Sequence, residues 1–371
     1  MTTADGGETI DRRRHTSRAL DASRHELAAE VTERQFAADP GLAARYGEAG
    51  KAKCRDDALR HLSYLSEAVA SGQPALFADY IAWAKVLLAG LNIPGEDLAR
   101  NLECLRDALR EGLPPDVHGP VIAYVEAGLE QLPRLPSEAP SFLDGDWPLA
   151  GLARQYLDAL MACRRDAASR LVLDAVASGV AVREIYLNVF QPSQYEIGRL
   201  WQSNRISVAQ EHFCTAATQL IMSQLYPHIF GAEKNGRRMV AACVGGDLHE
   251  IGVRMVADFF EMDGWDTFYL GASMPAGSIV GEVAERKADV LGISATLTSH
   301  IRGVAEVIEA VRSSGECRGV KVLVGGYPFN IAPGLWRRVG ADLYARNADE
   351  AIDLAGRLDR REAHDERSRR G

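Results

Sequence analysis

The sequence predicts a multi-domain protein that combines helical regions with one α/β domain. Apolar residues recur three and four apart over most of the first 230 residues, a spacing typical of amphipathic helices. After Arg237 short apolar runs alternate with helical stretches, which indicates βαβ units and a parallel sheet. We therefore expect domains at residues 24–132, 149–230 and 237–358.

The first region is predicted to be entirely helical. The stretches "DDALRHLSYLSEAVA", "ALFADYIAWAKVLLAGL" and "DLARNLECLRDAL" have helical spacing, and Gly-Pro clusters between them predict turns. The segment "LPRLPSEAPSFLDGDWP" then carries four prolines in residues 132–148, which favours an extended linker over a helix. Both chain ends, up to about Ser23 and from about Arg360, are charge-rich and are expected to be disordered.

Helices return in region 149–230, notably in "GLARQYLDALMACRRDAASRLVLDAVASG" and "ISVAQEHFCTAATQLIMSQLY". In region 237–358 the runs "RMVAACV", "TFYLG", "DVLGIS", "VKVLVGG" and "DLYA" predict five strands. Five strands alternating with helices suit a flavodoxin-like, doubly wound sheet of the Rossmann type. Such a sheet binds its ligands at the carboxyl ends of the strands.

Composition excludes several functional classes. A net charge of −9 argues against broad binding to a phosphate backbone, so no direct nucleic-acid partner is expected. No apolar run approaches the roughly 20 residues that span a bilayer, and the N-terminus lacks a signal-peptide pattern, so we expect a cytoplasmic protein without a membrane partner. The six cysteines form no CxxC pair, which argues against a disulfide framework or a zinc site. No P-loop or nucleophile elbow is present, and the chain is not expected to be an enzyme.

The candidate metal ligand is His249, in the loop that follows the first predicted strand. A neutral imidazole binds transition metals well, and an acid such as Asp247 fixes its tautomer and raises its basicity. One ligand holds a bare ion poorly, which implies that the metal arrives inside a macrocycle. The loop fits neither a zincin motif nor the G-x-G-x-x-G fingerprint. The alternative is that His249 is an ordinary loop histidine that hydrogen-bonds a neighbouring carboxylate and binds no metal.

The loop also resembles a known family. Asp247-x-His249-x-x-Gly252 matches the D-x-H-x-x-G signature of cobalamin-binding domains, as found in methionine synthase, corrinoid methyl carriers and B12-dependent mutases. The resemblance implies that His249 replaces dimethylbenzimidazole as the lower cobalt ligand.

Two later elements agree with this resemblance. Ser294-x-Thr296 follows the third predicted strand, and Gly325-Gly326 follows the fourth, where the family has S-x-L and G-G. The resemblance implies that the displaced nucleotide tail enters the fold near the serine and beside the glycines. Thr296 stands where the family usually has leucine.

The preceding helical region resembles the cap of the B12-dependent light-sensing repressors of carotenoid synthesis. The resemblance rests on Trp201 followed ten residues later by Glu211-His212. It implies that these side chains surround the upper, adenosyl face of adenosylcobalamin. The family has a histidine directly after the tryptophan, where this chain has Gln202. An ordinary core tryptophan and a polar helix face are the alternative.

Residues 24–132 resemble the globin-like, haem-free sensor domains of bacterial stress-response regulators. A domain of this kind before a cap and a cobalamin domain resembles the photocobilins, which bind adenosylcobalamin together with biliverdin. The resemblance suggests a bilin site at His61, Tyr64, Tyr80 and Trp83. Aromatic residues at helical spacing are also typical of an ordinary helical core.

Two functions from different classes follow. The first is a light-sensing signalling protein with adenosylcobalamin and biliverdin, in which photolysis of the cobalt–carbon bond changes cap packing and the state of a homo-oligomer, with a separate effector protein as a further partner. The second is a corrinoid methyl carrier of a methyltransferase system. Trp201 with Glu211-His212 favours the first, because a methyl carrier needs an open upper face. A mutase subunit is disfavoured because no large substrate barrel is present.

Overall fold

The computed structural model describes residues 4–357. The chain divides into two compact units, and the boundary falls between Glu138 and Ala139, inside the proline-rich segment. Within the described residues, no helix is both long enough and apolar enough to cross a membrane.

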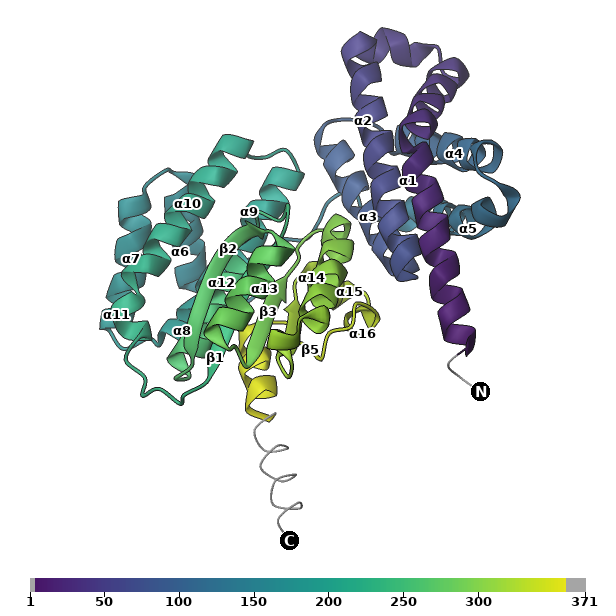
Figure 1. Cartoon of the computed structure of the whole chain (residues 1–371). Coiled ribbons are helices and arrows are strands. Elements are labelled where there is room, and N and C mark those ends of the chain that lie inside the picture. Colours follow the sequence, from purple (N-terminus) through teal and green to yellow (C-terminus); the bar gives the residue numbers. More distant parts are fainter. Residues whose placement is uncertain (1–3, 358–371) are drawn as a thin grey trace. The chain divides into compact units, whose positions relative to one another are not determined.

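The N-terminal unit is helical (Figure 1). Its elements are α1 (Ala4–Ala38), α2 (Gly41–Ser71), α3 (Pro74–Gly90), α4 (Gly95–Gly112), α5 (Pro115–Gln131) and the 3-10 turn η1 (Leu132–Arg134). Prolines occupy the first turns of α3 and α5, where a missing backbone N–H costs nothing. Gly72 ends α2 in the left-handed conformation, at φ 61°. A helical N-terminal region is confirmed, whereas its resemblance to a globin stays a prediction.

The expectation of disorder up to about Ser23 is wrong. Helix α1 begins at Ala4, and Leu20 is fully buried. Ser66 of α2 donates a hydrogen bond to the Ser17 carbonyl oxygen. Leu20 and the buried Thr16 and Ser17 are therefore enough to hold this charge-rich segment against the unit. The other expected disordered end, from about Arg360, lies outside the described residues.

The C-terminal unit begins with a helical bundle. Its elements are α6 (Ala150–Met161), α7 (Arg165–Ala177), α8 (Val182–Ile185), a π-helical turn η2 (Tyr186–Phe190), α9 (Gln191–Gln202), α10 (Val208–Gln224) and α11 (Tyr226–Ile229). Tyr156, Tyr186 and Phe190 are fully buried between these helices. Ser207 caps α10, because its Oγ accepts a hydrogen bond from the Gln210 backbone N–H.

A five-stranded parallel sheet follows the bundle and confirms the predicted α/β domain. The strands are β1 (Arg238–Val244), β2 (Asp266–Met274), β3 (Val290–Ser294), β4 (Lys321–Gly325) and β5 (Leu343–Tyr344). Their order is β2-β1-β3-β4-β5, which is the doubly wound, flavodoxin-like order. The order places β1 between β2 and β3, so the loops after β1 and β3 leave the same edge of the sheet.

Helices cover both faces of this sheet. They are α12 (Ile251–Met262), α13 (Ala276–Arg286), α14 (Ile301–Ser313), the short α15 (Tyr327–Ile331) and α16 (Leu335–Arg338), with the 3-10 turns η3 (Thr298–His300) and η4 (Gly315–Cys317). Met239, Ala241 and Cys243 pack in one core with residues of α12. Val244 points to the other face, where Gly303 of α14 lies beside it. Burial on both sides explains why β1 is a continuous apolar run.

Helix α12 belongs to two cores at once. Its Val253 and Phe260 pack on the sheet, whereas its Met255 and Phe259 pack into the bundle. The Tyr186 hydroxyl of the bundle donates a hydrogen bond of 2.8 Å to Asp258 Oδ2 on the same helix. Figure 1 shows the bundle helices beside α12 and β2. The bundle is therefore held against α12, the helix that follows the β1–α12 loop.

Candidate metal centre

The strand register brings the predicted loops together. Cys243 at the end of β1 pairs with Ser294 at the end of β3, and Ser294 pairs with Gly325 at the end of β4. The loops that follow these strands therefore meet at one edge of the sheet. This is the edge at which doubly wound folds bind their ligands.

The carboxylate of Asp247 organises the centre. It is fully buried, and its Oδ1 accepts hydrogen bonds from the backbone N–H of His249 at 3.0 Å and from His249 Nδ1 at 2.8 Å. Its Oδ2 accepts the backbone N–H of Thr296 at 2.7 Å. Burial alone would raise the pKa of Asp247, but these hydrogen bonds hold it well below its usual range. Asp247 is therefore a buried carboxylate that is charged and strongly bound.

The His249 imidazole, unlike the carboxylate of Asp247, is partly exposed to solvent. Its side chain is 56% exposed, and because Nδ1 binds Asp247, Nε2 is the ring nitrogen left for a metal. The hydrogen bond to Asp247 raises the pKa of His249, and the charge of Glu211 adds to that effect. An ionised acid behind the ring fixes the Nδ1–H tautomer and makes Nε2 a better ligand.

Two side chains that the sequence did not single out also belong to the centre. His300 Nδ1 lies 3.5 Å from Asp247 Oδ2. Glu250 accepts hydrogen bonds from Gln219 of α10 at 2.6 Å and from the Tyr269 hydroxyl of β2 at 2.7 Å, which ties the bundle to the loop. A histidine shortly after the strand that neighbours β1 was the available signal for His300. Glu250 offered no signal, because its partners are distant in sequence.

The glycines of the motif have different surroundings in the structure, so a side chain at each would have a different effect. Gly326 has φ 103°, and a Cβ there would lie 2.0 Å from the Ala295 carbonyl oxygen. A Cβ on Gly325 would lie 3.2 Å from the Ala345 carbonyl oxygen. A Cβ on Gly252 would meet nothing within 4 Å. The fold itself therefore demands Gly326, whereas Gly252 leaves open space in the first turn of α12.

The three bundle residues predicted for the upper face lie on two helices. Trp201 is half-buried on the last turn of α9, directly before Gln202. Glu211 and His212 lie in the first turns of α10, and Glu211 Oε2 is 2.5 Å from His212 Nδ1. The side chain of His212 is exposed. Of the three, Glu211 is the one whose charge raises the pKa of His249.

The four residues predicted to bind a bilin form a cluster on α2 and α3 in the N-terminal unit. His61 Nδ1 lies 2.7 Å from the Tyr80 hydroxyl, and the rings of Tyr64 and Tyr80 stack with centroids 3.9 Å apart. Trp83 follows at 6.2 Å from Tyr80. Burial lowers the pKa of His61 to about 4. These contacts also occur in an ordinary helix–helix core, and the bilin site stays a prediction.

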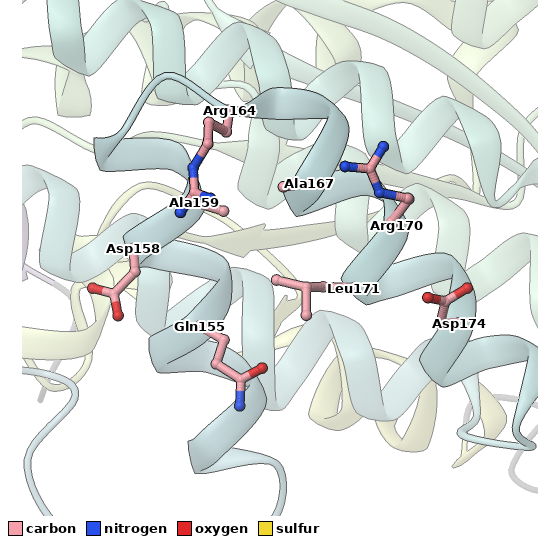
Figure 2. Close-up of a pocket in the computed structure, with 8 residues that line it drawn as sticks. All are labelled: Gln155, Asp158, Ala159, Arg164, Ala167, Arg170, Leu171 and Asp174. Carbon is pink, nitrogen blue, oxygen red and sulfur yellow. The ribbon is translucent and has the colours of Figure 1, made fainter.

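A separate surface depression of about 460 Å³ lies on the bundle between α6 and α7. Figure 2 shows Arg164 and Arg170 at its rim together with Asp158 and Asp174. The residues that line it all lie between Gln155 and Asp174, so it contains no part of the His249 loop.

The residues at the sheet edge fit a cobalt corrinoid. His249 offers one exposed nitrogen with a buried acid behind it. The neighbouring Leu248 is 74% exposed and provides apolar surface for a macrocycle to cover. Gly252 keeps the space beside the loop open. A doubly wound sheet with this loop and a helical bundle beside it defines a cobalamin-binding protein.

Comparison with known proteins gives the family. B12 binding domain families match residues 237–353 and residues 152–226. The chain is 30% identical over 215 residues to dimethylamine corrinoid protein 3 of Methanosarcina acetivorans, covering 57% of this chain and 98% of that protein. It is also 30% identical to dimethylamine corrinoid protein 2 of Methanosarcina mazei, covering 56% of this chain and 96% of that protein. The chain therefore belongs to the corrinoid protein family.

A solved structure supports the same fold. The monomethylamine corrinoid protein of Methanosarcina barkeri superposes with a TM-score of 0.51 at 23% identity, covering 57% of this chain and 99% of that protein. Both B12 binding domain matches lie in the C-terminal unit, and residues 4–138 lie outside them.

The prediction of a light-sensing protein is wrong. The dimethylamine corrinoid proteins among its relatives favour the methyl carrier that the sequence left as the alternative. Cobalamin as the cofactor is supported, whereas the adenosyl form and biliverdin find no support in these relatives. The physical reason is that a tryptophan at the end of α9 and a Glu-His pair at the start of α10 do not specify which group lies above the cobalt.

Proposed function

We propose that this chain is a corrinoid methyl carrier of a methyltransferase system. The observation that carries the proposal is the His249 imidazole, held by a buried Asp247 with Nε2 exposed at the carboxyl edge of the sheet. Membership of the corrinoid protein family supports it. When bound, the corrinoid cobalt supplies the chemistry of accepting and donating a methyl group.

The chain's own residues would hold and orient the cofactor. His249 would bind the lower face, and Asp247 would keep its ring in the required tautomer. Gln219 of α10 would hold the bundle close to this loop through its hydrogen bond to Glu250. No residue of this chain is proposed to perform the methyl transfer. The partners are proposed to be separate methyltransferases that approach the upper face.

The experiment tests whether the protein keeps its cofactor while a methyl group comes and goes. Purified protein is loaded with hydroxocobalamin, reduced with Ti(III) citrate, treated with methyl iodide and then exposed to a small thiol. Absorption spectra follow each step, and a desalting column separates bound from released cofactor. We expect one methyl group per bound cofactor and retention of the cofactor through repeated cycles.

His249→Ala is the informative variant, because it removes the proposed lower ligand and leaves the rest of the loop in place. We expect it to release the cofactor during the cycles. His228→Ala is the matched control, since this histidine lies on α11 outside the loop. A wild-type protein that loses its cofactor on methylation, or a His249→Ala variant that behaves like wild type, would contradict the proposal.

A further inference from the structure

The amino ends of three strands line a cavity at the edge of the sheet opposite the His249 loop. Val290 at the start of β3 pairs with Lys321 of β4 and with Met239 of β1, so the segments that lead into these strands lie side by side. The cavity that they line has a volume of about 340 Å³. Strand β1 has 7 residues, which at about 3.3 Å per residue places the cavity roughly 20 Å from the His249 loop.

Positive side chains dominate the wall of this cavity. They come from segments that are far apart in the sequence, and they are Arg237, Lys287, Arg318 and Lys321. No ion pair within residues 4–357 involves Lys287, Arg318 or Lys321. Arg286 and Arg312, which are close to them in sequence, each pair with a carboxylate. A chain with 51 acidic and 42 basic residues has carboxylates to spare, so these unmatched cations point to an anion from outside the chain.

The two acids in the wall do not neutralise these cations. Asp289 Oδ2 accepts the backbone N–H of Arg238 at 2.9 Å, so this carboxylate already binds the start of β1. Glu316 lies exposed in the turn η4 and forms no ion pair within the described part of the chain. Four positive and two negative side chains leave the wall with a charge of +2. A phosphate monoester carries about −1.5 to −2 at pH 7 and therefore matches this charge.

The size and the lining of the cavity favour a small ligand without an aromatic base. Its volume is near the lower limit, about 300 Å³, of pockets that bind small molecules. None of the described residues that line it is aromatic, so a nucleobase would find no ring on which to stack. The nearby Trp265 ring is covered by the Arg237 guanidinium, which lies 5.4 Å from the ring centroid. A Cβ on Gly319 would meet nothing within 4 Å, so the backbone beside Arg318 is open to a ligand.

We propose that this cavity is a second binding site, for the phosphate groups of a small non-aromatic anion held by Lys287, Arg318 and Lys321. The planar guanidinium of Arg318 can donate to two oxygens of one phosphate, and the two lysines act as point charges. The inference does not depend on the methyl-carrier function, because no residue of the His249 loop lines the cavity. A ligand that binds there would also stabilise the α/β domain, since it would join the segments before β3 and β4.

The test uses isothermal titration calorimetry on the full chain, with and without bound hydroxocobalamin. Inorganic pyrophosphate is the probe, and the ionic strength is held constant with sodium chloride because salt screens exposed charges. Glycerol 3-phosphate distinguishes a phosphate ester from an inorganic phosphate as the source of the anion. ADP carries the same pair of phosphates with a nucleoside attached. We expect pyrophosphate to bind in a 1:1 complex, with the same affinity whether or not the corrinoid is present, and ADP to bind no more tightly.

Substitutions in the wall should weaken this binding. Arg318→Gln and Lys321→Gln should each raise the dissociation constant of pyrophosphate about tenfold, because each removes a charged hydrogen-bond donor. Lys287→Gln serves as a further variant should Lys321→Gln, at the start of β4, fail to fold. Arg337→Gln is the matched control, since it removes one positive charge from an exposed position on α16, outside the cavity. Circular dichroism confirms that each variant is folded.

Several outcomes would overturn the inference. Absence of binding by wild type, or equal losses in Arg318→Gln and Arg337→Gln, would show that the cavity is not the site. Binding that hydroxocobalamin abolishes would place the anion in the corrinoid site. Tighter binding of ADP than of pyrophosphate would contradict a non-aromatic ligand. A chain that fails to keep its cofactor through methylation, yet binds pyrophosphate as expected, would overturn the methyl-carrier function and leave this inference standing.

Discussion

Burial of Asp258, which accepts the Tyr186 hydrogen bond between the bundle and α12, makes the stability of the protein depend on pH. Asp258 is buried, and burial raises its pKa to about 6, even though Tyr186 donates a hydrogen bond to it and Arg254 lies nearby. Glu261, the other charged group that acts on it, raises the pKa further. The ordinary value for an unfolded aspartate is about 3.9.

The sign follows from the raised pKa. Between about pH 4 and pH 6 the folded state binds more protons at Asp258 than the unfolded state does. The stabilising contribution is therefore complete below about pH 4 and is lost as the pH rises through 6. A shift of about 2 units, at about 1.4 kcal/mol per unit, amounts to about 3 kcal/mol.

Asp258→Asn removes the titration and keeps an oxygen that accepts from Tyr186. We expect the free energy of unfolding of this variant, relative to wild type, to increase by about 3 kcal/mol from pH 4 to pH 8. Urea unfolding followed by circular dichroism across this range gives the comparison. Asp174→Asn, at an exposed site on α7, is the control. Parallel pH profiles for wild type and Asp258→Asn would refute the reasoning.

Three further predictions concern the loops and the N-terminal core. Asp247→Asn should weaken cobalamin binding by about 10- to 100-fold in an absorption titration, because the carboxylate that orients the metal-binding histidine is lost. Unchanged affinity would count against the assignment. Gly326→Ala should lower the free energy of unfolding by at least about 2 kcal/mol more than Gly319→Ala, since both positions have positive φ but a Cβ at 326 would meet backbone at 2.0 Å and one at 319 would meet nothing; equal losses in urea unfolding would contradict this. Tyr80→Phe should cost about 1–3 kcal/mol, because it leaves His61 Nδ1 buried without its partner, and a stability within error of wild type would show that water replaces the hydroxyl.

The sheet was predictable because its signals are local. Strands β1, β3 and β4 are short apolar runs whose residues are mostly buried, and the alternation of strands with helices predicts a parallel, doubly wound sheet. Asp247 and His249 were predictable for the same reason. They are two residues apart, and the loop between them closes their hydrogen bond without help from elsewhere in the chain.

The features that the sequence missed depend on contacts between distant segments. His300 reaches Asp247 because β3 lies beside β1, and Glu250 meets Gln219 because the bundle packs on α12. The part of the first helix up to Ser23 was missed for another reason. Its charge-rich sequence gives little helical periodicity, and its few buried residues, such as Leu20, are held by α2 and not by a regular pattern of their own.

The wrong functional prediction has a related physical origin. The two faces of the proposed cofactor are met by different parts of the chain. In the proposed carrier the lower face would meet the loop in which Asp247 binds His249 and Thr296, and this arrangement does not distinguish one upper cobalt ligand from another. In the proposed carrier the upper face would meet the bundle, where His212 is exposed and bonded to Glu211, and the spacing of these side chains does not specify an adenosyl group. In the proposed carrier the upper face must admit a methyltransferase. The bundle is held to the loop by hydrogen bonds such as Gln219–Glu250, and its polar end is exposed. This arrangement suits access by a partner better than a closed apolar cap would.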